Sequence, residues 1–195
     1  MDDPQRNDAI HVQAAPGRAS LGPLVEAFDA RSDLLLERIR GNAIADRVFT
    51  TASHVGDFSL VWHSIGLARA IIRRRPDQFI VLAAAIGAES LIVNQGVKRI
   101  FRRARPTVAG DERLQVRQPS TSSFPSGHAS AAAFAATLLT AWDGRRWGRL
   151  WWTIASVVGA SRAYVRIHHA SDVVGGAVVG RALALLVRPS LRRLR

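Results

Sequence analysis

Apolar residues in the last three quarters of the chain fall into runs that are separated by arginine-rich breaks. The first two runs approach the roughly 20 residues that a helix needs to cross a bilayer, and the others reach that length if the polar residues at their ends lie among lipid headgroups. The pattern predicts an all-α membrane bundle of five apolar helices, or six with one earlier span. The runs occupy residues 48–72, 79–97, 129–142, 150–165 and 173–187.

Three charged residues interrupt the first two of these runs, namely Asp57, Arg69 and Glu89. A charged side chain is costly in contact with lipid, so we expect all three to face the bundle interior. The mean hydropathy of the chain is only +0.05, which is low for a membrane protein. A compact soluble helical domain is therefore the alternative to a membrane bundle.

The start of the chain has a different pattern. Residues 1–20 are polar and lack periodicity, which predicts a disordered arm, and because they begin acidic with no apolar run we expect no secretory signal. In residues 21–47, apolar positions fall mostly three and four apart, which predicts an amphipathic helix. This helix would lie along the membrane interface or pack on the rest of the protein, residues 48–195.

Composition narrows the function classes. The chain of 195 residues contains no cysteine, which excludes disulfides, thiolate chemistry and cysteine-based zinc sites. The net charge of +12 at first suggests nucleic-acid binding. However, residues 1–47 are net acidic, and the basic residues lie in the apolar remainder of the chain. A chain that is basic and apolar in the same region suits a membrane protein better, so we expect no nucleic-acid partner.

Polar residues gather in three clusters at the ends of apolar runs: residues 98–106, 123–130 and 161–172. If consecutive helices are antiparallel neighbours, all three clusters lie at the same end of the bundle. The chemistry-bearing residues expected there are Lys98, Arg105, His128, Arg162, His168 and Asp172.

These residue types suit a phosphoryl group. Arginine and lysine bind phosphate oxygens, and a helix that starts near Ser126 and Gly127 adds backbone N–H groups and the positive end of its dipole. Two histidines supply a nucleophile and a proton donor near neutral pH. Asp172 follows His168 by four residues, so its carboxylate can hold one ring nitrogen while the other faces phosphorus.

Other interpretations apply to several of these residues. The run before Gly127 is also typical of a simple helix cap. We expect Arg99, Arg102 and Arg103 to be membrane anchors at a helix end, and His54, His63 and His169 to be structural. A metal site made of His128, His168, His169 and Asp172 is an alternative that three nearby cations would oppose.

The clusters together resemble the signature of the type 2 phosphatidic acid phosphatase superfamily. That signature reads Lys, six residues, Arg-Pro; then Pro-Ser-Gly-His; then Ser-Arg, five residues, His, three residues, Asp. Every position and spacing is matched, and the signature spans residues 98–172. The matching residues are Lys98, Arg105-Pro106, Pro125 to His128, Ser161-Arg162, His168 and Asp172.

The resemblance implies a role for each matching residue. The match to His168 attacks phosphorus, the match to Asp172 orients it, and the match to His128 protonates the leaving group and later activates water. The remaining matches bind the phosphoryl oxygens, and no metal or other cofactor is needed. These binding residues are Lys98, Arg105, Ser126, Gly127 and Arg162.

The sequence therefore predicts an integral-membrane lipid phosphatase with a lipid phosphomonoester or diphosphate as substrate. Candidate substrates are phosphatidic acid, phosphatidylglycerol phosphate, polyprenyl diphosphates and a polyprenyl-linked sugar phosphate. Alternatives are a soluble acid phosphatase or haloperoxidase-like enzyme of the same superfamily, and a non-catalytic basic module that binds anionic lipid. No oligomeric state is indicated.

Membrane members of the superfamily commonly have six spans, whereas five apolar runs are present here. Arginines are more numerous at the end away from the motifs once the three motif cations are set aside. The positive-inside tendency then predicts a multi-pass protein of the cell membrane with an extracytoplasmic active site.

Overall fold

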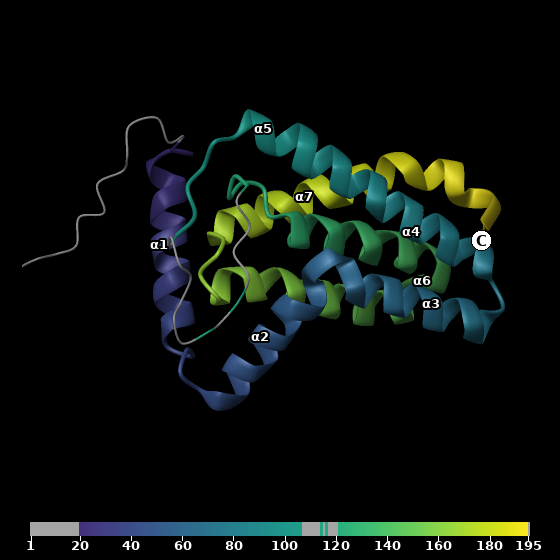
Figure 1. The fold of residues 1–195 in the computed structure, drawn as a ribbon, viewed down its shortest axis with the longest axis horizontal. Helices are drawn as coiled ribbons and strands as arrows, with labels where there is room; N and C mark the ends of the chain where they lie inside the picture. Colours follow the sequence, from purple (N-terminus) through teal and green to yellow (C-terminus); the bar gives the residue numbers. More distant parts are fainter. Residues whose placement is uncertain (1–19, 107–113, 115, 117–120, 195) are drawn as a thin grey trace, which may run out of the picture.

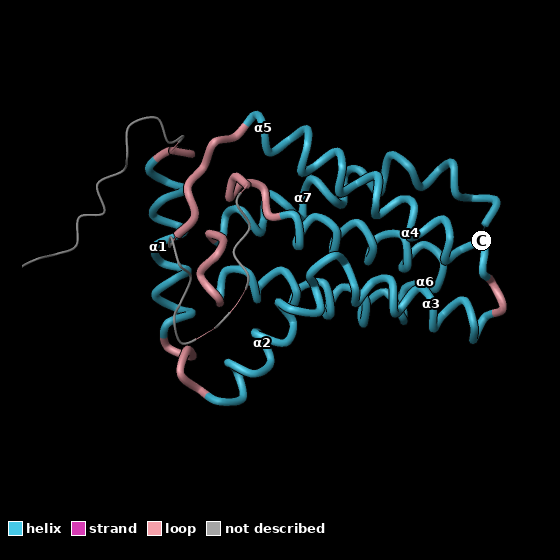
Figure 2. Tube along the Cα trace, in the orientation of Figure 1, coloured by secondary structure: helices cyan, strands magenta, loops and turns pink. Residues whose placement is uncertain are grey.

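The computed structural model describes residues 20–106, 114, 116 and 121–194. Within these residues the regular structure is entirely helical, as Figure 2 shows, which confirms the predicted all-α class. The arm predicted over residues 1–20 lies outside the described residues except for Ser20.

The predicted bundle is present as five roughly parallel rods (Figure 1). The rods come from the helices α3, α4, α6 and α7, of which α6 supplies two. Their bounds are Leu60–Arg73 for α3, Pro76–Leu91 for α4, Gly127–Tyr164 for α6 and Ala170–Val187 for α7. A π-helical stretch, Ile92–Val97, continues α4 into the short helix α5, Lys98–Ile100.

The long α6 turns back on itself at Gly144, whose φ of 79° and ψ of 178° are not helical. Residues on the two sides of this break touch, since a Cβ added at Gly159 would lie 3.7 Å from that of Ala129. Positive φ favours glycine because it has no Cβ. The third and fourth predicted segments are therefore two antiparallel rods, as expected.

Small residues allow α7 to approach α6 closely. A Cβ on Gly176 would lie 2.3 Å from the carbonyl oxygen of Ser126, and one on Gly180 would lie 2.0 Å from that of Ser130. Small residues four apart are typical of tightly packed membrane helices. The contact fixes the first turns of α6 against α7.

The bundle core is apolar with a few buried polar pairs. Large side chains such as Trp62, Leu82 and Phe134 fill its centre. Arg69 forms an ion pair with Asp143 at 2.6 Å, and the buried Glu89 accepts a hydrogen bond from Ser130. The expectation that Arg69 and Glu89 face the bundle interior is confirmed.

Two predicted segments are divided differently in the structure. Residues 21–47 form the helix α1, Pro23–Glu37, a turn, and the start of α2, Ala43–Gly56. The side chain of Asn42 caps α2 by accepting from two backbone N–H groups, so α2 begins before the predicted apolar run at residue 48. That run is also broken, because Asp57–Ser59 forms a tight turn with positive φ at Phe58 and Ser59.

Helix α1 lies across the end of the bundle, nearly perpendicular to the rods (Figure 1). It exposes Leu24, Leu34 and Leu35, whereas Asp29 is buried against the bundle. The helix is therefore attached through the polar Asp29 and the partly buried Leu36, and presents other apolar side chains outward.

Two helical stretches have the length and hydropathy to cross a membrane: Pro76–Ile100 and Ala170–Leu191. Large apolar side chains are exposed along the rods, including Ile72, Ile80, Val178 and Leu186. An apolar exterior on long helices favours the membrane bundle over the compact soluble alternative.

Candidate active site

The three polar clusters meet at one end of the bundle, as the antiparallel arrangement predicts. A cavity of about 770 Å³ opens there between the turn after α2, the end of α4 and the start of α6. Among the residues that line it are Lys98, Thr121, Gly127, His128 and His168.

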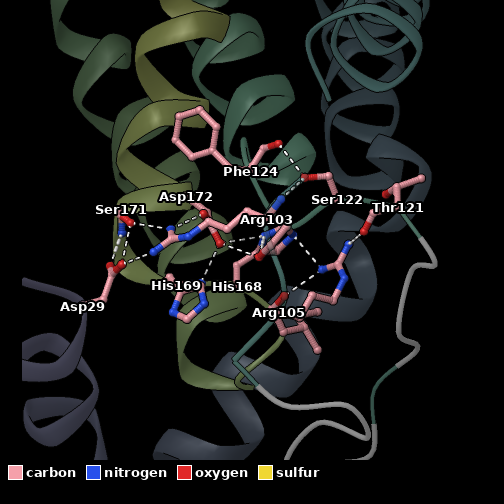
Figure 3. Close-up of polar contacts among 12 residues, drawn as sticks. Asp29, Arg103, Arg105, Thr121, Ser122, Phe124, His168, His169, Ser171 and Asp172 are labelled. Atoms are coloured by element: carbon pink, nitrogen blue, oxygen red, sulfur yellow. Dashed lines mark hydrogen bonds and ion pairs between the residues drawn. The ribbon is translucent and has the colours of Figure 1, made fainter. Parts of the chain in front are cut away.

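His168 is buried in the turn between α6 and α7, and its two ring nitrogens face different partners (Figure 3). Nδ1 lies 3.6 Å from Oδ2 of Asp172 and 3.4 Å from Oγ of Ser123. Because Ser123 Oγ donates to Asp172 at 2.5 Å, it can accept from Nδ1–H. This arrangement places the proton on Nδ1 and leaves Nε2 as the nitrogen without a proton.

Arg105 faces the unprotonated Nε2 of His168. Its Nη1 lies 3.3 Å from Nε2 of His168 and donates to the carbonyl oxygen of Ile167 at 2.7 Å. Its Nη2 donates to the carbonyl oxygen of Thr121 at 3.0 Å. A guanidinium held in this way would place a phosphoryl group beside Nε2 of His168.

Four side-chain polar atoms in the described part of the chain are buried without a hydrogen-bond partner. They are Nε of Arg105, Oγ of Ser126, and Nε and Nη2 of Arg162. Leaving buried donors unpaired is costly, so such atoms mark strain or a ligand site. All four belong to residues that the sequence assigns to phosphate binding.

The guanidinium of Arg162 is held through Nη1, the nitrogen that does have partners. Its Nη1 donates to the side chain of Ser53 on α2 and lies 3.9 Å from Oδ1 of Asp57. The guanidinium is 1% exposed, so α2 fixes it while Nε and Nη2 stay available. Helix α2 thus supplies part of the site, which the sequence did not predict.

Lys98 and Gly127 lie on the cavity wall. The Lys98 ammonium is buried and 3.3 Å from Oγ1 of Thr121. A Cβ added at Gly127 would come within 3.9 Å of Nζ of Lys98 and 3.2 Å of the Asn94 side chain. The first turn of α6 therefore faces the lysine, with the helix N-terminus directed at the same space.

His128 pairs with Asp57. Its Nε2 lies 2.9 Å from Oδ1 of Asp57, the residue at the turn between α2 and α3. Asp57 was expected to face the interior, and it lines the cavity instead of packing in the core. A carboxylate at this distance orients the imidazole.

Burial is the main influence on the titration of His168. It lowers the pKa of His168 from 6.5 to about 3, and the charge of Arg105 acts in the same direction while Asp172 opposes both. The imidazole is therefore neutral at physiological pH, as a nucleophile must be.

The alternative metal site does not assemble. In the part of the chain that the structure describes, no group of three or more histidine or acidic side chains could hold a metal ion. His128 pairs with Asp57, whereas the backbone N–H of His169 donates to Asp172 at 2.8 Å at the start of α7. His54 is exposed on α2, and His63 lines the cavity.

The membrane-anchor interpretation is wrong for Arg103. Arg99 and Arg102 are exposed, as an anchor requires, but Arg103 is buried. Its Nη1 lies 2.5 Å from Oδ1 of Asp172 and its Nη2 lies 2.5 Å from Oδ2 of Asp29 on α1. Two carboxylates inside the protein draw this arginine away from the membrane surface.

Sequence reasoning missed four residues of this site: Asp29, Ser53, Arg103 and Ser123. Arg103 and Ser123 lie inside the motif clusters, so their position was a usable signal. Asp29 and Ser53 lie in helices far from the motifs in sequence, and nothing in the local pattern distinguishes them from surface residues.

Comparison with known proteins gives independent evidence on the family of this chain. The model of the PAP2 superfamily matches residues 78–195. The decaprenylphosphoryl-5-phosphoribose phosphatase of Mycobacterium tuberculosis H37Rv is 32% identical over 154 residues, which cover 75% of this chain and 83% of that protein. The enzyme of the same name from Mycolicibacterium smegmatis is 33% identical over 126 residues, covering 64% and 67%.

Two solved structures share the fold. A transmembrane PAP2-type phosphatidylglycerolphosphate phosphatase from Bacillus subtilis has a TM-score of 0.70 at 24% identity and covers 90% of each chain. LpxE of Aquifex aeolicus has a TM-score of 0.68 at 21% identity, covering 88% of this chain and 99% of that one. The matched family model, the curated relatives and the convergence of the three motifs establish that this chain belongs to the PAP2 superfamily and is a phosphatase.

Proposed function

We propose that this chain is an integral-membrane lipid phosphatase that works through a phosphohistidine at His168 and needs no metal. The carrying observation is the set of buried, unpaired donors on Arg105, Ser126 and Arg162. Arg105 lies beside Nε2 of His168, the charge of Arg162 also acts on that ring, and a phosphoryl group bound there would satisfy the unpaired donors. The charge that develops on the phosphoryl oxygens would be stabilised by groups already in place.

The first step transfers the phosphoryl group to the enzyme. The lone pair on Nε2 of His168 attacks phosphorus while the bond from phosphorus to the leaving oxygen of the lipid-linked substrate breaks, and His128 gives its proton to that oxygen. His168 gains positive charge, which Asp172 balances from the Nδ1 side. Asp57 holds His128 in the position of the general acid.

The second step releases phosphate. His128, now neutral, takes a proton from water, and the resulting hydroxide attacks phosphorus as the phosphorus–nitrogen bond breaks. The electron pair returns to Nε2, so His168 is again neutral and His128 is again protonated. Inorganic phosphate leaves, and the enzyme is restored.

A polyprenyl-linked sugar phosphate is the substrate class we favour. The curated relatives are named for a decaprenyl-linked phosphoribose. Beyond the phosphate residues the cavity is lined by groups that can bind sugar hydroxyls, namely Ser59, His63, Ser90, Asn94 and Gln95. Phe58, 76% exposed, lies on the same cavity and offers an apolar contact for a lipid chain.

The proposed orientation of the protein in the membrane is based on the apolar surface of the rods. We place α3, α4, α6 and α7 across the bilayer, with α1 in the interface at the active-site end. A group of basic residues outside the motifs, including Arg73, Arg74, Arg145 and Arg146, lies at the opposite end. The positive-inside tendency supports an extracytoplasmic active site.

Phosphate release from a panel of lipids tests this function. Purified protein in detergent with EDTA is given polyprenyl-phosphoryl phosphoribose, polyprenyl diphosphate, phosphatidylglycerol phosphate and phosphatidic acid. We expect the sugar-linked lipid to have the highest kcat/KM, vanadate to inhibit, and His168→Ala to lose activity. His54→Ala, which changes an exposed histidine on α2, is the matched control and should behave as wild type.

The outcomes separate the parts of the proposal. Activity that survives His168→Ala contradicts the nucleophile. Activity that EDTA abolishes and a divalent metal restores contradicts metal independence. Equal kcat/KM values across the panel contradict the substrate class but not the phosphatase mechanism.

A further inference from the structure

The two carboxylate oxygens of Asp172 contact different groups (Figure 3). Oδ2 faces His168 and accepts from Ser123 Oγ and from the backbone N–H of His169. Oδ1 accepts from Nη1 of Arg103 at 2.5 Å. With Oδ1 held by the guanidinium, rotation of the carboxylate is restricted and Oδ2 stays directed at His168.

Arg103 is itself fixed to the loop that carries Ser123. Its backbone N–H donates to Ser122 Oγ at 3.1 Å, and its carbonyl oxygen accepts from the backbone N–H of Ser123 at 3.0 Å. The arginine and the serine therefore approach Asp172 as one unit. A group that holds the Arg103 side chain in place therefore also holds Asp172, because Arg103 donates to its Oδ1.

Asp29 on α1 holds that side chain from the other end. Its Oδ2 accepts from Nη2 of Arg103 at 2.5 Å and from Oγ of Ser171 at 2.7 Å, and its Oδ1 accepts from the Ser171 backbone N–H at 2.8 Å. Ser171 lies in the first turn of α7, directly before Asp172. Asp29 thus binds both the arginine and the helix start that carries the catalytic carboxylate.

The charges have a consequence for catalysis. A guanidinium paired with Asp172 alone would cancel the negative charge that His168 needs when it bonds to phosphorus. A second carboxylate on the same guanidinium leaves one negative charge over the cluster. All three charged groups are less than a tenth exposed, so solvent screens them weakly.

We propose that Asp29 and Arg103 are positioning residues for the Asp172–His168 pair, so that α1 takes part in catalysis. The inference rests on the proposed nucleophilic role of His168. The sequence assigns Arg103 to the membrane surface and gives Asp29 no role, and the contacts above replace both assignments. Helix α1 is then more than a membrane-lying segment, because its buried acid completes the charge balance of the site.

The test compares Asp29→Asn with Asp33→Asn. Asn keeps an acceptor for Ser171 but removes the charge, whereas Asp33 is on the same helix, half-exposed, and paired with Arg40 and Arg166 away from Asp172. We expect Asp29→Asn to lower kcat about 10–100-fold with little change in KM, as for other partners of catalytic groups. Asp33→Asn should keep wild-type kcat, and Asp29→Glu should recover part of the loss.

Two inhibitors distinguish positioning from a structural role. Bound vanadate keeps a bond to the nucleophile, whereas inhibition by inorganic phosphate reflects mainly the ion that occupies the binding pocket before any bond to His168 forms. Asp29→Asn should weaken inhibition by vanadate about as much as it lowers kcat, and leave inhibition by phosphate unchanged. Unchanged kcat and vanadate inhibition, or equal weakening of both inhibitors, would overturn the proposal.

Two further variants, a substitute and a control, ensure that the experiment gives a clear outcome. If Asp29→Asn does not fold in detergent, Arg103→Lys takes its place. Lysine keeps the charge, but its single ammonium cannot reproduce the two separate guanidinium nitrogens that contact Asp29 and Asp172. The same change in vanadate inhibition is expected, and its absence overturns the proposal. His168→Asn is measured alongside. If that variant stays active, the proposed function fails, whereas a wild-type Asp29→Asn beside an inactive His168→Asn refutes only the role of α1.

Discussion

At the residue scale, the site combines a neutral histidine, the proposed nucleophile, with cations that are only partly neutralised. His168 is enclosed by the protein, and Arg105 lies 3.3 Å from its Nε2. Arg162 and Ser126 keep buried donors without partners. The unpaired donors therefore destabilise the folded protein until a phosphoryl group binds them, as is typical of functional sites.

The depressed pKa of His168 makes stability depend on pH. In the unfolded chain this histidine takes up a proton near its ordinary value of 6.5, whereas in the folded protein its pKa is about 3. Between these values the unfolded state binds more protons, so the free energy of unfolding falls as the pH falls from about 6.5 toward 3. Above about pH 6.5 this histidine is neutral in both the folded and the unfolded state, so its titration costs no stability there.

Thermal unfolding in detergent from pH 8 to pH 5 measures this effect. We expect the unfolding temperature of wild type to fall more steeply with decreasing pH than that of His168→Asn, which lacks the titrating ring. His169, whose pKa is also lowered by burial, is present in both proteins and does not affect the difference. Parallel curves for the two proteins would contradict the assigned pKa.

At the scale of the elements, close packing of α6 on α7 sets the site. Gly176 and Gly180 lie against the backbone of Ser126 and Ser130, at the helix turn that carries the phosphate-binding residues. The N–H of Ser126 also donates to the carbonyl oxygen of Asp172 at 2.9 Å. Two of the three motifs are therefore joined through backbone contacts.

Gly180→Ala should destabilise the protein. The added methyl would lie 2.0 Å from a backbone oxygen, so α7 must move away from α6. We expect a loss of roughly 1–3 kcal/mol, as for overpacking elsewhere, seen as a lower unfolding temperature. Gly87→Ala is the control, because a Cβ there meets nothing within 4 Å, and similar unfolding temperatures for both variants would refute the packing argument.

Sequence pattern predicted the rods and the end where the motifs meet, because hydrophobic runs and their alternation depend on local composition. It did not predict the break at Phe58, where two residues adopt positive φ without a glycine. It also missed the contact from Asp29 to Arg103, since a pair 74 residues apart leaves no local signal. Long-range polar contacts are set by how the helices dock and only the structure shows them.

At the scale of the whole molecule, the apolar rods and the polar end have separate roles. The exposed side chains of the rods suit lipid, and the cavity lies at the end where α1 crosses the bundle. A lipid substrate can then keep its chain beside the rods while its phosphate enters the cavity. In the proposed function, the net charge of +12 is divided between the helix ends and one small anion site.

Exchange of oxygen between phosphate and water tests the central claim, the phosphohistidine at His168. Inorganic phosphate labelled with ¹⁸O is incubated with the enzyme in ordinary water, and the remaining label is followed by mass spectrometry. Reversal of the second step forms the phosphohistidine and expels labelled oxygen as water. We predict steady loss of label with wild type and with His54→Asn, and none with His168→Asn; loss of label that continues in His168→Asn, or a wild-type enzyme that hydrolyses lipid phosphate without any exchange, would contradict the account.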